Sequence, residues 1–223
     1  MTGIPTVGSY GMPAHAELPV NTVDWTLEPH RAVLLIHDMQ QYFLRPFGRQ
    51  SPLFDELLAN ITHLRDVCAA AGVVIAYTAQ PGGMTREQRG LLRDFWGDGM
   101  SVDESDREII PELTPREEDW VFTKWRYSAF HKSDLAARLR DCGRDQMIVC
   151  GVYAHVGILM TACDAFSHDV ETFLVSDAIA DFTRADHVMT LEYAASRCAM
   201  VQSTDRIASA LSNTAIVAGS KEA

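Results

Sequence analysis

Two charged side chains stand where packing alone does not explain them. Asp38 lies in the stretch AVLLIHDMQQYF at residues 32–43, after five consecutive apolar residues, and Lys124 closes the run WVFTK at residues 120–124. Apolar runs with branched residues are typical of strands buried on both faces of a parallel sheet. Ligands of such sheets bind beyond the carboxyl ends of the strands. The sequence therefore predicts an acid and a base beside a bound substrate.

A third element belongs to the same group, namely the strand-to-helix turn that follows Cys150. An acid, a base and a turn with free N–H groups are the parts needed for proton transfer and for stabilising a developing charge. Two simpler interpretations stay open from these residues alone. Asp38 could cap a turn or the next helix, and Asp38 and Lys124 could form a purely structural ion pair.

Strands and helices alternate along the chain, which sets how these residues are positioned. Predicted strands cover residues 32–37, 73–79, 120–124 and 146–152, one starts at Thr172 as TFLVSDA, and a short one lies near Met200. Predicted helices cover residues 52–71 with Gly72 as the cap, a segment from about Thr85, and residues 132–142, 154–168 and 184–197. We expect a single-domain three-layer α/β/α fold with a mostly parallel, doubly wound, Rossmann-like central sheet.

The remaining segments divide the chain into an arm, a domain and a tail. Residues 1–30 contain four prolines and predict an extended arm on the surface or on a partner subunit. We expect the domain over residues 31–211 and a C-terminal tail over residues 212–223. The acidic connection at residues 97–119 is long for a compact domain, and such loops are often functional.

Composition excludes several classes of function. The formal net charge of −11 argues against a general nucleic-acid binder and against attraction to anionic membranes. Five cysteines form no CxxC pair and no metal-ligand spacing, which fits a reducing compartment. Neither a leader sequence nor an apolar run long enough to cross a bilayer is visible, so we expect a cytoplasmic protein.

The order Asp38, Lys124 and the turn GVYAHVG at residues 151–157 resembles the isochorismatase-like hydrolase superfamily. The family pattern has a catalytic Asp after the first strand, a Lys after the third, and usually a nucleophilic Cys where the fourth strand enters its helix. Here Gly157 stands at the nucleophile position, so no acyl-enzyme can form there. The Asp-x-His metal site of the nicotinamidases is replaced by AQPGG. The resemblance implies an enzyme without metal or cofactor.

Four longer segments are similar to the phenazine-pathway branch of the same family: RAVLLIHDMQ, AYTAQPGGMTREQRGLLRDFWG, TKWRYSAF and CGVYAHVG. That branch hydrolyses the vinyl ether of 2-amino-2-deoxyisochorismate to pyruvate and trans-2,3-dihydro-3-hydroxyanthranilate. The same chemistry on isochorismate, giving 2,3-dihydro-2,3-dihydroxybenzoate, is the closest alternative. A non-catalytic scaffold and, more remotely, a cysteine hydrolase are the others.

Vinyl ether hydrolysis needs a proton at the terminal methylene carbon, and Asp38 is the candidate donor. It must then be neutral near pH 7, although its ordinary pKa is about 3.9. Burial and a dianionic substrate raise that pKa, whereas Lys124 lowers it. We expect Asp38 to take up its proton as the dianion binds.

Further residues are expected to bind this small dianionic substrate. Arg89 is the candidate carboxylate clamp, and Gln80 can hydrogen-bond the ether, a hydroxyl or the amino group. Gly157 leaves room for the ring. The resemblance adds four aromatic residues at the pocket, namely Tyr153, Phe43, Trp96 and Tyr127. A solvated helix-face arginine and ordinary core aromatics are the simpler alternatives.

Other candidates for chemistry are interpreted as structural. His37 should point away from Asp38 on the strand, and His155 has no partner at ligand spacing, so we expect no metal site at either. In SDAIADF at residues 176–182, after the fifth strand, Asp177 and Asp181 are expected to shape a turn. The resemblance also implies a cis peptide near Val152–Tyr153 and a homodimer.

Overall fold

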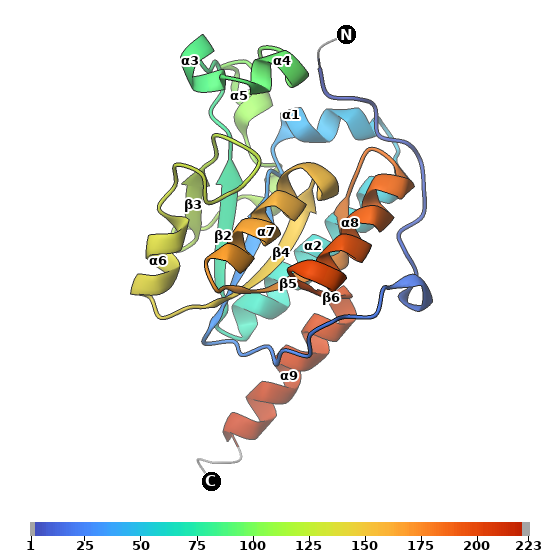
Figure 1. The fold of residues 1–223 in the computed structure, drawn as a ribbon, viewed down its shortest axis with the longest axis vertical. Helices are drawn as coiled ribbons and strands as arrows, with labels where there is room; N and C mark the ends of the chain where they lie inside the picture. Colours follow the sequence, from blue (N-terminus) through green and yellow to red (C-terminus); the bar gives the residue numbers. More distant parts are fainter. Residues whose placement is uncertain (1–2, 220–223) are drawn as a thin grey trace.

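Six strands form the central sheet of the protein in a computed structural model that describes residues 3–219, with the side chains of residues 3–212 (Figure 1). The sheet order is β3-β2-β1-β4-β5-β6, and every pair of neighbours runs parallel. The strands are β1 (Ala32–His37), β2 (Val74–Ala79), β3 (Trp120–Thr123), β4 (Gln146–Val152), β5 (Glu171–Ala180) and β6 (Met200–Gln202). The sheet is therefore entirely parallel within this part of the chain.

Helices cover both faces of the sheet. Longer helices α2 (Pro52–Ala70) and α9 (Thr204–Gly219) lie on one face, and α6 (Leu135–Asp141), α7 (Leu159–Ser167) and α8 (Arg184–Arg197) lie on the other (Figure 1). Shorter helices gather above the carboxyl ends of the strands: α1 (Gln41–Leu44), α3 (Arg86–Arg89), α4 (Leu92–Trp96) and α5 (Glu104–Arg107). The predicted three-layer α/β/α fold is confirmed.

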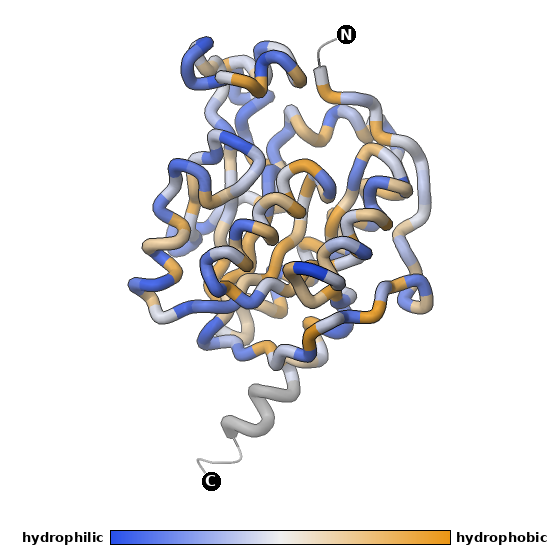
Figure 2. Tube along the Cα trace, in the orientation of Figure 1, coloured by the Kyte–Doolittle hydropathy of each residue, from blue (hydrophilic) through white to orange (hydrophobic). Residues whose placement is uncertain are grey.

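Two apolar cores hold the layers together, one on each face of the sheet. All six residues of β1 are buried, and Leu34 and Ile36 point into one core while Val33 and Leu35 point into the other. Figure 2 shows the same pattern, with hydrophobic colouring along the strands between the helices. Burial on both faces explains why the strands appear as unbroken apolar runs in the sequence.

The order in which successive strands are added to the sheet reverses at β1. β2 and β3 follow one another on one side of β1, whereas β4 pairs with the other side of β1. The loops after β1 and β4 therefore diverge, and a crevice opens at the carboxyl ends of these two strands. This crevice is where Asp38 and the turn after β4 lie.

Several elements differ from the prediction. The helix expected from Thr85 ends after one turn at Gly90, which has φ +51°, and α4 follows it. The expected helix 132–142 begins only at Leu135, and the expected helix 154–168 begins as a π-helical turn at residues 154–158. The segment 176–182 was expected to follow the fifth strand, but β5 extends to Ala180. The loop 97–119 contains α5, a 3₁₀ turn, and a bridge from Gln40 to Ile109.

The N-terminal arm lies along its own domain. The N–H of Gly8 donates to Phe182 O at 2.8 Å, and the side chain of Asn21 pairs with the backbone of Val201. The predicted boundary at residue 211 falls inside α9, so the chain has no break there, and residues 220–223 of the predicted tail lie outside the described residues. Among the described helices, none is long and apolar enough to cross a membrane.

Candidate active site

The loops after five neighbouring strands, β1 to β5, meet around one pocket. Its volume is about 520 Å³, which includes space open to solvent. All nine residues selected from the sequence line it, namely Asp38, Phe43, Gln80, Arg89, Trp96, Lys124, Tyr127, Tyr153 and Gly157. Ile4 of the arm, Tyr42 and Phe182 also line it and were missed. Tyr42 is next to Phe43 in sequence, whereas Ile4 and Phe182 have no local signal and arrive only through the fold.

Asp38 is held by contacts from two neighbouring strands. The Thr78 hydroxyl donates to Oδ1 at 2.6 Å and accepts the Asp38 N–H at 3.1 Å, because β1 and β2 align His37 with Thr78. Nζ of Lys124 lies 2.7 Å from Oδ2. Both charged residues are almost fully buried, with 5% of Asp38 and 3% of Lys124 exposed. The pair is thus a desolvated contact at the pocket wall.

Opposing effects set the protonation state of Asp38. Burial is the largest influence and raises the pKa of the carboxyl, but Lys124, His37 and the Thr78 hydroxyl act against it. The net result is a pKa below the ordinary value of an aspartate. In the protein without a ligand, Asp38 is therefore a carboxylate at neutral pH.

His37 does not point away from Asp38 as expected. Asp38 has φ +53°, which breaks the strand alternation, and Nδ1 of His37 lies 3.7 Å from Oδ2 of Asp38. The ring is fully buried and donates from Nδ1 to Val152 O at 2.9 Å. Burial lowers the pKa of His37 to about 4, so the ring is neutral at pH 7.

Arg89 places a second buried cation in the pocket wall. It is the last residue of α3 and is 6% exposed, with Nε donating to Gly97 O at 3.0 Å and Nη1 donating to Gln80 Oε1 at 3.4 Å. No carboxylate of the described residues forms an ion pair with it, and burial lowers its pKa. A buried, unpaired guanidinium is costly, so this wall is suited to an anion.

Aromatic rings enclose the rest of the pocket. Nε1 of Trp96 donates to the Tyr127 hydroxyl at 2.8 Å, and the Tyr153 hydroxyl donates to Phe43 O. The rings of Tyr153 and Phe182 lie 4.2 Å apart between centroids. Burial raises the pKa of Tyr153, which keeps its hydroxyl neutral. These contacts fix the rings around the Asp38–Lys124 pair.

The turn after β4 brings backbone close to the pocket. A cis peptide joins Val152 and Tyr153, as the resemblance implied, and a π-helical turn carries Gly157. Gly157 is buried and has no side chain to separate the pocket from the turn. The carboxyl end of β4 therefore presents main chain where a nucleophile would otherwise stand.

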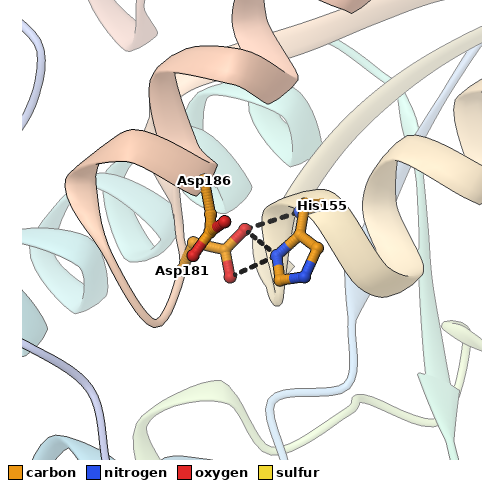
Figure 3. Close-up of side chains that lie close together, drawn as sticks. All are labelled: His155, Asp181 and Asp186. Carbon is orange, nitrogen blue, oxygen red and sulfur yellow. Dashed lines mark hydrogen bonds and ion pairs between the residues drawn. The ribbon is translucent and has the colours of Figure 1, made fainter.

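His155 has a partner that sequence spacing did not reveal. Its Nδ1 lies 2.8 Å from both carboxylate oxygens of Asp181, and its backbone N–H donates to Oδ2 at 2.6 Å (Figure 3). Asp181 also accepts the N–H of Phe182 at 2.8 Å, and Asp186 lies beside the pair. The hydrogen bond that its Nδ1–H donates to the Asp181 carboxylate raises the pKa of His155. Protein donors thus already occupy the Asp181 carboxylate, which caps the turn after β4.

Asp177 does not shape the turn after β5, because it lies within that strand and binds the start of α9. Its Oδ1 accepts the N–H and the hydroxyl of Thr204 at 2.8 Å each, at the start of α9. Asp181 shapes the turn at the pocket, and Asp177 fixes the helix on the opposite face. The two aspartates of this segment therefore serve different helices.

Known proteins are similar to this chain in sequence and in fold. The sequence model of the isochorismatase domain matches residues 32–206. Phenazine biosynthesis protein PhzD1 of Pseudomonas aeruginosa is 58% identical over 207 residues, which cover 93% of this chain and 99% of that protein. An isochorismatase of Bacillus subtilis is 48% identical over 94% of this chain and 67% of its own length. The structure of a cysteine hydrolase from Pseudomonas syringae superposes with a TM-score of 0.80 at 25% identity, covering 88% of this chain and 98% of that one.

Proposed function

Because this chain belongs to the isochorismatase family, we propose that it hydrolyses the vinyl ether of 2-amino-2-deoxyisochorismate to pyruvate and trans-2,3-dihydro-3-hydroxyanthranilate. One observation carries the proposal: a buried Asp38–Lys124 pair faces a pocket whose wall holds the guanidinium of Arg89, which forms no ion pair with a carboxylate of the described residues. An acid beside a cationic wall suits protonation of an anionic, electron-rich ether. The similarity to a phenazine biosynthesis protein over nearly its whole length supports the choice of substrate.

The reaction is a balanced addition of water. The carbon–carbon double bond takes a proton from Asp38 at its terminal methylene carbon, which leaves an oxocarbenium ion. Water then adds to that ion and gives a proton back to the Asp38 carboxylate. In the resulting hemiketal the bond to the ring oxygen breaks, the hydroxyl proton is lost as the carbonyl of pyruvate forms, and the departing ring oxygen takes up a proton to become a hydroxyl. Asp38 therefore acts as the acid first and accepts a proton afterwards, with no covalent intermediate.

Charge balance explains how Asp38 acquires its proton. In the free protein Asp38 is ionised beside Lys124, and Arg89 leaves the pocket with an excess of positive charge. A substrate with two carboxylates reverses that excess, and protonation of Asp38 restores neutrality. Binding of the dianion thus raises the pKa of the residue that must donate the proton.

The other pocket residues hold the substrate. Arg89 binds one carboxylate through two parallel N–H groups, and Gln80 beside it hydrogen-bonds the ether or the amino group. Lys124 balances the developing charges, and Gly157 leaves space for the ring. Four aromatic residues in the wall limit the access of bulk water: Phe43, Trp96, Tyr127 and Tyr153.

A second substrate has its own support. The relative from Bacillus subtilis is named an isochorismatase, and isochorismate differs from the proposed substrate by a hydroxyl in place of an amino group. This difference is small enough that a single contact in the pocket can decide between the two substrates or fail to do so. The chemistry at Asp38 is the same for both.

The experiment measures pyruvate release from both substrates at equal low concentrations, with the Asp38→Asn variant as control. We expect a preference for the amino substrate that is lost in the variant. Calorimetry of dianion binding in buffers of different ionisation enthalpy should show uptake of about one proton, and Asp38→Asn should abolish it. Equal rates favour the isochorismate alternative, and no pyruvate from either substrate makes the scaffold alternative the one to pursue.

We also propose a cytoplasmic homodimer with a single hydrolase domain and the arm as part of each subunit. Apolar side chains exposed on α7 and α8 support an interface, among them Phe166 and Tyr193. All five cysteines are free, which supports a reducing compartment. Light scattering coupled to gel filtration tests the dimer, and a monomer at micromolar concentration contradicts it.

A further inference from the structure

The buried ring of His37 lies directly against Gly157. A Cβ placed on Gly157 would lie 2.3 Å from Cε1 of His37 and 3.1 Å from Nε2. The first distance is far below van der Waals contact, so a side chain at position 157 and the observed ring cannot occupy this space together. One of the two has to move.

The ring has little freedom to move. It is 0% exposed, and its Nδ1–H is bonded to Val152 O at 2.9 Å. On its other side lies the Thr161 hydroxyl, 3.3 Å from Nε2. That hydroxyl is itself fixed, because it donates to Gly157 O at 2.7 Å and accepts the N–H of Ala129 at 3.0 Å. His37 is therefore part of a closed, buried arrangement around the turn after β4.

We propose that His37 is a positioning residue that keeps position 157 free of a side chain and fixes the turn after β4 opposite Asp38 and Lys124. The imidazole occupies the volume that a nucleophile at position 157 would need, so the pocket floor consists of backbone. A cysteine hydrolase has the same fold, which shows that thiol chemistry is compatible with it. In this chain the ring of His37 excludes that chemistry by volume.

The steric part of this inference is independent of the proposed function, and only the part on substrate turnover rests on it. A double-mutant cycle on stability therefore tests the steric part without any substrate. His37→Asn is the suitable partner, because an asparagine amide can keep the donor to Val152 O while removing Cε1 and Nε2. Gly157→Ala adds the methyl group alone.

We expect Gly157→Ala to raise the unfolding equilibrium constant about 10- to 100-fold in the parent chain, because overpacking destabilises the folded state. In the His37→Asn background, Gly157→Ala should change the unfolding equilibrium constant by less than about threefold. His187→Asn is the matched control, since His187 is equally buried but hydrogen-bonds with Ser176 and Tyr10. In the His187→Asn background, Gly157→Ala should change the unfolding equilibrium constant as much as in the parent chain. Equal costs in the His37→Asn and parent backgrounds would overturn the steric assignment.

The single Gly157→Ala variant gives a second measurement if His37→Asn does not fold. Its crystal structure should show the ring displaced and the bond to Val152 O lost. An unmoved ring beside the new methyl group contradicts the proposal.

Kinetics separate positioning from simple stability. His37→Asn should keep kcat for pyruvate release within about fivefold, and His37→Val, which lacks the donor, should lose at least about tenfold in kcat with KM little changed. Equal kcat values for the two variants contradict the positioning role. If the parent chain releases no pyruvate, the proposed function fails while the stability cycle still decides the steric assignment.

Discussion

Two ion pairs flank the central strand β1, one at each end. At the amino end, Nε of Arg31 lies 2.7 Å from Oδ1 of Asp145, and the two side chains are 29% and 55% exposed. At the carboxyl end, Nζ of Lys124 lies 2.7 Å from Oδ2 of Asp38, with side-chain exposures of 2% and 6%. The charges are equally close, so the two pairs differ mainly in their access to water.

That difference separates a structural contact from a chemical one. Water screens the exposed Arg31–Asp145 pair, here called the outer pair, and such pairs contribute about 0.2–1 kcal/mol to stability. The buried Lys124–Asp38 pair, the inner pair, has lost its hydration, so a new charge in the pocket strongly shifts the pKa of Asp38. Burial at a strand end, rather than ion-pair geometry, therefore makes the protonation of Asp38 sensitive to a bound ligand.

The largest expected effect is the loss of the acid. Asp38→Asn should lower kcat/KM for pyruvate release at least about 10³-fold, because the amide cannot deliver the proton. Asp145→Asn makes the same chemical change at the outer pair and should leave kcat/KM within about twofold. Activity of the Asp38→Asn variant within tenfold of the parent would remove Asp38 as the donor.

Arg89 tests whether the buried cation is kept for the ligand. Arg89→Met should raise KM about 100-fold, because a charge-assisted contact to a carboxylate is lost. The free energy of unfolding should stay equal or rise by up to about 1 kcal/mol, since a desolvated, unpaired charge disappears. Arg31→Met is the matched control, and it should lower stability without changing KM. A drop in stability with unchanged KM for Arg89→Met would assign the residue to the fold.

Acidification should reveal the buried neutral ring of His37. Its pKa is about 4 in the folded protein against about 6.5 unfolded, so the unfolded chain binds more protons between these values and stability falls as pH falls. Between pH 7 and pH 5, His37 should lower the free energy of unfolding by about 2 kcal/mol.

Urea unfolding at both pH values measures this loss. His37→Asn should reduce the pH dependence by that amount, and His30→Asn, an exposed histidine near the outer pair, is the control. The same pH dependence in His37→Asn and the parent would contradict a buried neutral ring.

The smallest effect belongs to the outer pair. Asp145→Asn should lower the free energy of unfolding by less than about 1 kcal/mol, and the loss should shrink in 1 M salt because exposed charges are screened. Measured at low and high salt, a loss that does not shrink would mean that this pair is less hydrated than its exposure indicates.

The layers and most of the strand positions could be predicted from the sequence alone. Apolar runs report burial on both faces, and their alternation with amphipathic segments permits few topologies. The same logic placed Asp38 and Lys124 at strand ends, and Gly157 at the turn. Helix boundaries near Thr85 and Leu135 were less accurate. Gly90 with positive φ ends α3 after one turn, and α6 begins three residues later than expected, after Lys132 with positive φ.

Only the tertiary structure decided which side chains meet at the pocket and how they are charged. Phe182, Ile4 and the Asp181–His155 contact arrive from distant segments, so no local spacing announces them. The proximity of Asp38 to the His37 ring depended on the positive φ of Asp38, which the rule of alternation cannot anticipate. Local patterns follow from backbone periodicity, whereas desolvation and long-range contacts are properties of the assembled sheet, and these set the pKa of Asp38 and the space beside Gly157.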